Sequence, residues 1–319
     1  FQEQVELEET KALYQARAFG RFLERNSDNP WVCFFSTLEP HPPLVGPTTS
    51  RYSPFDVTLP GNFGVRPDVT TPVYVRHKYK TLRKDGFKEF RCQTAMDWRR
   101  IIAAYWGLNA LVDMAVGRVI DQLKRHNLYE NTLIVFTSDH GSMMSSHALL
   151  AKDVQYEEAV RVPLAIKFPH QSHGKTVDDP VSHIDVIPTL LDSIDAPVPS
   201  FLPGRSLMPY YKNGHDTQRR PVFIERNTPL SIGNLYRDTP GLGKDADRAL
   251  HAGVRTIVTP EGWKFSRAQS GEMELYNLAN DPGELTNLAY GPDFQQQASE
   301  LLARLLVWQQ EQGDSVTLI

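Results

Sequence analysis

Apolar side chains recur at helical spacing in four parts of the chain. In residues 9–26 and 94–127 they fall every three or four positions, and the second stretch ends in basic residues that suit a helix C-terminus. Shorter stripes of the same kind lie within residues 178–194, after a loop, and across residues 294–309. A period near 3.6 predicts amphipathic helices with one face in a hydrophobic core.

Three other stretches are apolar without alternation: residues 31–36, 133–137 and 162–168. Continuous apolar runs of this length are typical of buried strands, and residues 133–137 fit a strand covered on both faces of a parallel sheet. Because the long helix at 94–127 leads directly into the strand at 133–137, the order of elements favours an α/β sheet.

The last third of the chain has a different pattern. Residues 221–225, 252–259, 263–267 and 274–277 are short β-type runs separated by turn residues, which predicts antiparallel pairing. We therefore expect two domains, residues 1–212 and 213–319, with the helix near the C-terminus covering the second sheet. Two loops rich in Pro, Gly and polar residues, 46–93 and 227–250, are expected to be irregular, and the second is expected to border a pocket.

Composition narrows the classes of partner. The net charge of −4 gives no basic footprint for nucleic acid. No apolar run is long enough to cross a bilayer, so we expect no membrane partner. The two cysteines, Cys33 and Cys92, do not have metal-ligand spacing, and their state is left open. Nothing in the sequence sets an oligomeric state.

The chemistry is expected at the end of the strand at 133–137, where Asp139, His140 and Gly141 follow. Ligands in open α/β sheets gather at the carboxyl ends of strands. An adjacent carboxylate and imidazole can both bind a divalent cation, and Lys152 supplies a positive charge suited to an oxyanion. The alternatives are that Asp139 caps a helix and that Lys152 is an ordinary surface lysine.

Two further histidines are candidates. His41 lies between prolines, which restrict the backbone and hold the imidazole in a defined direction. An imidazole can protonate a leaving oxygen, although a histidine in such a loop is often only a surface residue. His147 fits either a pocket rim or a hydrogen bond within its loop.

These motifs together resemble the sulfatase family of the alkaline-phosphatase superfamily. The resemblance covers nearly the whole chain and rests on the following segments: IVFTSDHG at 134–141, H-x-L-x-x-K at 147–152, YEEAVRVPL at 156–164, EPHPP at 39–43, HID and PTLLD at 183–185 and 188–192, ELYNL at 274–278, NDPGE at 280–284 and TNL at 286–288. It implies an α/β fold with an alkaline-phosphatase-like mixed sheet flanked by helices, and a smaller C-terminal α+β subdomain of antiparallel strands and a helix.

The resemblance also implies roles. Asp139 and His140 would be metal ligands, with calcium preferred over magnesium or manganese. Lys152 and His41 would be catalytic, the lysine on sulfate oxygens and the histidine on the ester or as general acid. The reaction would be hydrolysis of a sulfate ester in a small molecule or glycan, and family members are expected in the periplasm or outside the cell. Asp185, by contrast, is expected to pack and cap a helix.

Several family features have no counterpart in these residues: the nucleophile motif, a pair of metal-binding aspartates, and a Lys and a His that relatives carry in their first third. The family nucleophile is formylglycine, made from a Cys or Ser in a C/S-x-P-x-R motif, and neither Cys33 nor Cys92 lies in one. Because the chain opens on Phe1 without an initiator Met, we expect a truncated or processed chain whose missing N-terminal third carries the nucleophile. A phosphodiesterase or phosphonate monoester hydrolase of the superfamily, or a non-catalytic protein that binds sulfated ligands, remain as alternatives.

Overall fold

The computed structural model describes residues 5–87, 90–216, 218–227 and 249–318. These residues form two compact units that interleave along the chain. The first comprises the described residues within 1–63, 81–139 and 162–172, and the second those within 64–80, 140–161 and 173–319. The sequence-predicted boundary between residues 212 and 213 stays a prediction.

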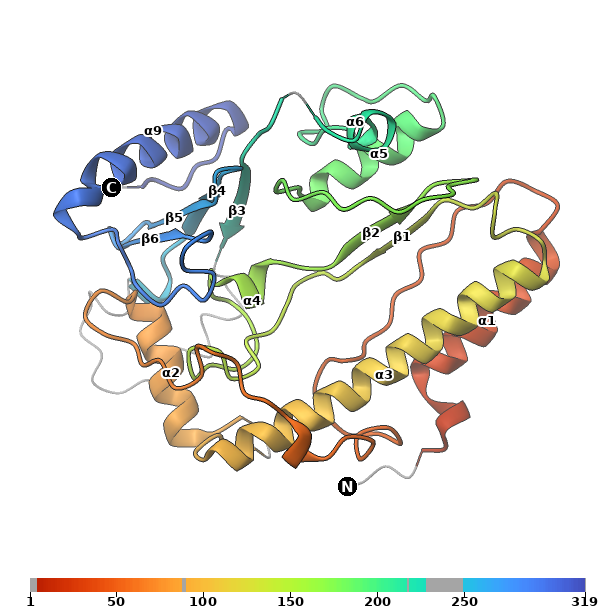
Figure 1. Ribbon diagram of the computed structural model, residues 1–319, viewed down its shortest axis with the longest axis horizontal. Coiled ribbons are helices and arrows are strands. Elements are labelled where there is room, and N and C mark those ends of the chain that lie inside the picture. Colours follow the sequence, from red (N-terminus) through yellow and green to blue (C-terminus); the bar gives the residue numbers. More distant parts are fainter. Residues whose placement is uncertain (1–4, 88–89, 217, 228–248, 319) are drawn as a thin grey trace. The chain divides into compact units, whose positions relative to one another are not determined.

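The first unit is built on two helices, α1 (Lys11–Asn26) and α3 (Ala95–Arg125), which lie side by side (Figure 1). Their apolar stripes meet in a core that includes Leu13 and Leu111, both almost fully buried. The helix at 94–127 is confirmed, and Thr94 and Asp97 form a capping box at its start. The helix predicted at 9–26 is also confirmed, with Thr10 as its N-cap residue.

The strands of this unit differ from the expectation. β1 (Ile134–Thr137) pairs with β2 (Leu164–Lys167), but the pair is antiparallel and Phe136 is 43% exposed. A parallel strand buried on both faces was therefore the wrong interpretation. A short apolar run cannot reveal the direction of its partner, because that partner is chosen by contacts far away in sequence.

The strand predicted at 31–36 is not observed. This segment is extended without a β-partner among the described residues, and Val32 and Phe34 are 96% and 92% exposed. Trp31 and Phe35 instead pack against a core cluster that contains Leu23 of α1 and Leu123 of α3. An apolar run becomes a strand only where a neighbouring backbone supplies hydrogen bonds, and local sequence does not contain that information.

The second unit contains the sheet order β3-β4-β5-β6, with every neighbouring pair antiparallel. The strands are β3 (Val222–Arg226), β4 (Val254–Val258), β5 (Trp263–Ala268) and β6 (Met273–Asn277). The helix α9 (Gln295–Gln312) covers one face of this sheet (Figure 1). The C-terminal antiparallel sheet with its helix was predicted correctly.

Strand alternation decides what each face of that sheet carries. Phe265 and Leu275 point to the α9 side, and both are fully buried there. The neighbouring positions, Lys264, Glu274 and Tyr276, therefore point to the opposite face. These three side chains are also buried, so the face of the sheet opposite α9 carries buried charged and polar groups.

Shorter helices complete the chain: α2 (Val73–Asp85), α4 (Glu157–Val160), α5 (Val186–Ser193) and α6 (Met208–Asn213), with 3-10 turns at Leu7–Glu9, Pro54–Asp56, His183–Asp185 and Pro292–Phe294. The helix within 178–194 is confirmed by α5. The loop expected at 46–93 contains α2, which the sequence analysis missed because its few apolar positions lie among many basic ones. Most of the loop expected at 227–250 lies outside the described residues. None of the described helices is both long enough and apolar enough to span a membrane.

Candidate active site

The candidate site begins where β1 ends. Thr137 closes the strand by donating its hydroxyl to the carbonyl of Pro163 at 2.9 Å. The chain then turns at Asp139 and His140, and the His140 side chain is half-buried. His140 Nδ1 lies 2.8 Å from the carbonyl oxygen of Gly141, so Nδ1 carries the proton and Nε2 keeps its lone pair. This is the tautomer that a metal-binding imidazole requires.

His140 and Lys152 lie together in the structure. The Lys152 ammonium donates a hydrogen bond to His140 Nε2. Lys152 is itself half-buried rather than solvated like most surface lysines. An ammonium and an imidazole lone pair are thus fixed side by side at the end of a strand.

The loop that joins these two residues is tightly constrained. Gly141 donates its N–H to the carbonyl of Ala159, and a Cβ at position 141 would lie 2.1 Å from the carbonyl oxygen of Glu158. Gly141 is therefore required by a close backbone approach. Six non-glycine residues between Met144 and Asp153 have positive φ, which side chains rarely adopt. Such conformations cluster at sites whose geometry the surroundings impose.

A second lysine supports this loop. Lys78, on α2, donates a hydrogen bond to the backbone carbonyl of Lys152, and its Nζ lies 3.4 Å from Asp153 Oδ2. Its side chain is 17% exposed, and burial lowers the pKa of its ammonium. Lys78 adds positive charge beside Lys152 and fixes the backbone that carries it.

The segment that follows Lys152 is bound at Glu157 by the buried ammonium of Lys264. Lys264 on β5 lies 2.9 Å from a carboxylate oxygen of Glu157 and 2.8 Å from one of Glu284. The Glu284 carboxylate also accepts the backbone N–H of Glu157 at 2.6 Å. The first residue of α4 is thus tied to the sheet through both its side chain and its backbone.

At this buried face of the sheet, carboxylate side chains outnumber basic ones. Glu274 accepts a hydrogen bond from the Tyr276 hydroxyl at 3.1 Å and is 3% exposed. Burial and the nearby Glu284 raise the pKa of Glu274 to about 7. Burial likewise raises the pKa of Glu284 to about 7, and the paired carboxylates raise that of Lys264. The raised pKa values of Glu274 and Glu284 mean that these buried carboxylates take up protons near neutrality.

Asp139 lies exposed at the end of β1. Burial raises the pKa of Tyr105 on α3, and the negative charge of Asp139 raises it further. No set of three or more His, Cys, Asp or Glu side chains that could hold a metal is found in the part of the chain that the structure describes. Asp139 and His140 are consecutive and offer one hard oxygen ligand and one imidazole nitrogen, which fits part of a divalent-cation site.

His41 belongs to the first unit and is exposed in its proline-rich loop. Its Nδ1 lies 2.7 Å from the carbonyl oxygen of Pro42, and its backbone N–H donates to the carbonyl of Leu38. The ring is therefore oriented by the loop, as the flanking prolines predicted.

The contacts of His147 and Asp185 test the roles that the sequence analysis gave them. His147 is 5% exposed, stacks on Tyr156 with ring centroids 4.0 Å apart, and contacts the Gly283 carbonyl at 3.0 Å. This favours the hydrogen-bonding role over the pocket rim. Asp185 is buried and accepts the N–H groups of Ser182 and Arg205, both at 2.9 Å. Its side chain thus completes the capping box of the 3-10 turn His183–Asp185, whereas at the start of α5 it makes no side-chain cap hydrogen bond.

Sequence reasoning missed Lys78 and the buried Lys264. The motifs YEE and NDPGE contain Glu157 and Glu284, which could have signalled buried carboxylates in need of a cation. No sequence pattern indicated which lysine would meet them, because the contact joins residues 107 positions apart.

Comparison with known proteins identifies the family of this chain. The family model described as Sulfatase matches residues 10–196. A multifunctional alkaline phosphatase superfamily protein of Trinickia caryophylli is 27% identical over 308 residues, covering 92% of this chain and 58% of that protein. An ulvan-active sulfatase of Formosa agariphila is 26% identical over 299 residues, covering 92% of this chain and 51% of that protein.

Solved structures of related enzymes have the same fold. The phosphonate monoester hydrolase of Agrobacterium radiobacter superposes with a TM-score of 0.79 at 29% identity, over 97% of this chain and 62% of that one. The corresponding hydrolase of Silicibacter pomeroyi gives 0.80 at 25% identity, over 96% of this chain and 61% of that one. The chain thus has the alkaline-phosphatase-like α/β fold with a C-terminal α+β subdomain.

These relatives are longer than this chain, which spans about half the length of the two curated proteins. The match to the Sulfatase family model nevertheless covers more than half of the 319 residues. The chain therefore belongs to the sulfatase family of the alkaline-phosphatase superfamily.

Proposed function

We propose that the complete protein hydrolyses sulfate esters, and that this chain supplies the metal-binding and sulfate-binding side of its active site. The observation that carries the proposal is the contact between Lys152 and His140 Nε2. It places a cationic donor for oxyanions beside an imidazole whose tautomer suits metal binding.

Asp139 and His140 would bind a divalent cation, with calcium preferred over magnesium or manganese. When bound, such an ion neutralises negative charge on a sulfate oxygen and holds the nucleophile in place. In this arrangement the lysine turns from the imidazole to the oxygens of the ester. Lys78 binds the backbone at Lys152, and Lys264 binds Glu157 at the start of α4.

Lys152 would stabilise the charge that develops on the oxygen of the leaving alcohol and on the sulfate. His41 is proposed as the group that contacts the ester and protonates the leaving alcohol, a role based on the EPHPP segment alone. An imidazole oriented through Nδ1 by its own loop has Nε2 available for such a proton transfer.

The nucleophile is proposed to be formylglycine supplied by a segment beyond these 319 residues. Sulfated carbohydrates or small aryl sulfates are the proposed substrates. The similarity to a protein named as an ulvan-active sulfatase supports a carbohydrate.

A second function has its own support. Two of the structural relatives are phosphonate monoester hydrolases, with TM-scores of 0.79 and 0.80. Phosphonate monoesters are monoanions like sulfate esters, so the same ammonium and cation would bind either group. We therefore consider phosphonate monoester or phosphodiester hydrolysis the alternative activity.

The test uses the full-length protein produced from its complete reading frame. Turnover is measured for a nitrophenyl sulfate, the matching phenylphosphonate monoester and the matching phosphodiester, with Lys152→Ala and Lys80→Ala as site and surface variants. A larger kcat/KM for the sulfate, lost in Lys152→Ala alone, supports the proposal. A larger value for the phosphonate supports the alternative. Sulfate-ester binding without turnover of any substrate would contradict both and support a non-catalytic binding protein.

A further inference from the structure

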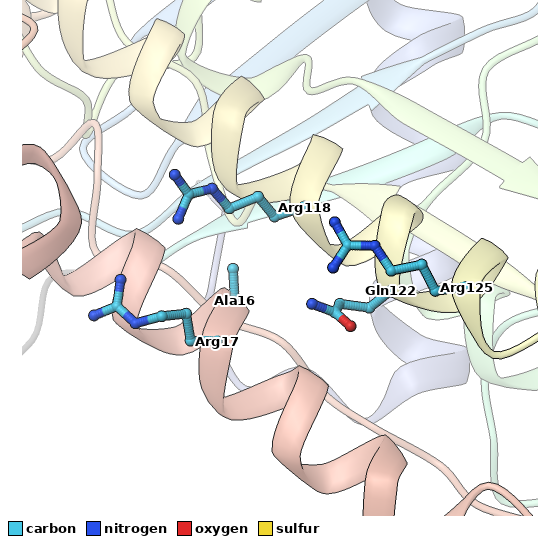
Figure 2. Close-up of a pocket in the computed structure, with 5 residues that line it drawn as sticks. All are labelled: Ala16, Arg17, Arg118, Gln122 and Arg125. Carbon is cyan, nitrogen blue, oxygen red and sulfur yellow. The ribbon is translucent and has the colours of Figure 1, made fainter.

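A pocket of about 200 Å³ lies between α1 and α3, within the first unit and apart from the strand-end residues considered so far. Figure 2 shows its lining: Ala16, Arg17, Arg118, Gln122 and Arg125. Three of the five side chains are guanidinium groups, and no carboxylate is among the five. A volume of this size holds several waters at roughly 30 Å³ each, or one small oxyanion with part of a larger ligand.

The geometry of the helices places these groups together. Arg118, Gln122 and Arg125 are four and three positions apart on α3, so they share one face. Ala16 comes from the facing side of α1 and is 1% exposed, so its small side chain forms the floor of the pocket. The Gln122 carboxamide packs beside Gly20, where a Cβ would lie 3.1 Å from the amide carbon.

A carboxylate of the chain already uses two of the arginines. Both terminal nitrogens of Arg118 donate to the two carboxylate oxygens of Glu8. Arg17 donates to the same carboxylate at 3.1 Å. These hydrogen bonds, chiefly those from Arg118, lower the pKa of Glu8. The fork of donors is therefore arranged for a planar or tetrahedral oxyanion.

Positive charge remains after this pairing. Arg125 has no ion-pair partner within the described part of the chain, and its guanidinium group shares the pocket with Arg17 and Arg118 (Figure 2). With Glu8 counted, the four charged groups carry a net charge of +2. A pocket lined by three guanidinium groups favours an anionic ligand.

We propose that this pocket binds a tetrahedral oxyanion, such as a sulfate or phosphate group, and that the ligand competes with the exposed Glu8 carboxylate, which pairs with two of the lining arginines. The bound group would take the place of Glu8 on the fork of Arg118 and would also reach Arg125. The site is independent of the catalytic proposal, because it uses no residue of the β1 end. That the anion belongs to a sulfated glycan is an extension that rests on the proposed function.

The test measures binding of radiolabelled inorganic sulfate by equilibrium dialysis at low ionic strength. A Lys152→Ala background removes the strand-end lysine as a competing site. The double variant Arg118→Ala/Arg125→Ala is expected to weaken sulfate binding at least about tenfold. Arg21→Ala is the matched control, because Arg21 is an exposed arginine of α1 that stacks on Tyr14 and does not line the pocket.

Glu8→Gln gives an independent readout. Removing the competing carboxylate charge should tighten sulfate binding several-fold, while a variant that only damaged the fold would weaken it. Equal loss in the double variant and in Arg21→Ala, or unchanged binding in Glu8→Gln, would overturn the proposal. A second series with a sulfated disaccharide distinguishes the source of the anion. Tighter binding of the disaccharide than of inorganic sulfate identifies a glycan subsite, and equal binding identifies a site for the free anion.

Discussion

The ammonium of Lys264 lies 2.8 Å from a carboxylate oxygen of Glu284, and both side chains are 1% exposed. Two opposite charges are thus paired almost entirely out of water. Removing one partner of such a pair leaves the other charge buried and uncompensated, which costs more than the pair itself contributes. This pair also ties the start of α4, and with it the Lys152 loop, to the sheet.

We therefore expect Lys264→Met to lower the free energy of unfolding by roughly 3–5 kcal/mol, as measured by urea denaturation. Lys212→Met, at an exposed lysine of α6, is the control and should stay within about 0.5 kcal/mol of the parent. The double variant Lys264→Met/Glu284→Gln should recover part of the loss. No recovery would mean that the cation acts through packing rather than through charge.

The pH dependence of stability should reveal Glu274. Its pKa is about 7 in the folded protein and 4.5 ordinarily, so the folded state binds more protons than the unfolded state between these values. Stability contributed by this group therefore falls as pH rises through this window, by at most roughly 3 kcal/mol. Glu274→Gln should reduce the slope of the stability profile between about pH 4.5 and 7, and the slope that remains belongs to Glu284, whose pKa is also about 7. An unchanged profile would assign the dependence to other groups.

Asp139→Ala in the full-length protein is expected to abolish metal-dependent hydrolysis and to weaken calcium binding by tenfold or more. Asp178→Ala, at an exposed aspartate, is the control. Calcium binding is measured by calorimetry and turnover by release of the aryl alcohol. Retained turnover in Asp139→Ala would contradict its assignment as a metal ligand.

The contact of Lys78 with the Lys152 carbonyl predicts a change in local dynamics. Lys78→Met should speed hydrogen exchange at loop amides that are bonded within the loop, such as those of Met143 and Ser145. A hydrogen bond from a charged donor contributes about 1.5–3 kcal/mol, so protection should fall about tenfold or more. Lys80→Met, at an exposed position on the same helix, should leave exchange unchanged. Equal exchange in both variants would contradict the supporting role of Lys78.

Gly141→Ala is expected to lower the free energy of unfolding by about 1–3 kcal/mol, because the added Cβ meets the fixed carbonyl oxygen of Glu158. Gly117→Ala provides a control of opposite sign. Gly117 lies inside α3, and a Cβ added there would have no neighbouring atom within 4 Å, so alanine should stabilise the helix by up to about 1 kcal/mol. Thermal denaturation measures both. A neutral Gly141→Ala would mean that the backbone there yields.

The features that the sequence predicted correctly are those encoded locally. α3 follows from its own apolar stripe and from the Thr94 capping box, and the C-terminal sheet follows from short β-type runs between turns. In both cases the deciding residues lie within a few turns of chain. A positive charge from Lys152 near the strand end was expected, but its hydrogen bond to His140 Nε2 is seen only in the structure.

The errors concern contacts between distant segments. The segment containing Val32 and Phe34 is as apolar as a strand, but no neighbouring strand among the described residues pairs with it. The direction of β1 relative to β2 depends on a connection of more than twenty residues. Likewise, Lys264 is one of many lysines until folding brings Glu157 and Glu284 to it.

The run of left-handed backbone between Met144 and Asp153 also limits how this loop can be used elsewhere. Each such conformation in a non-glycine residue costs of order 1 kcal/mol or more, and only the surrounding core and lysine contacts hold the segment in place. A peptide with these ten residues should not retain the shape, nor should a graft onto a foreign scaffold. The loop would keep its conformation in another protein only if the sheet and the helix that contact it were transferred with it.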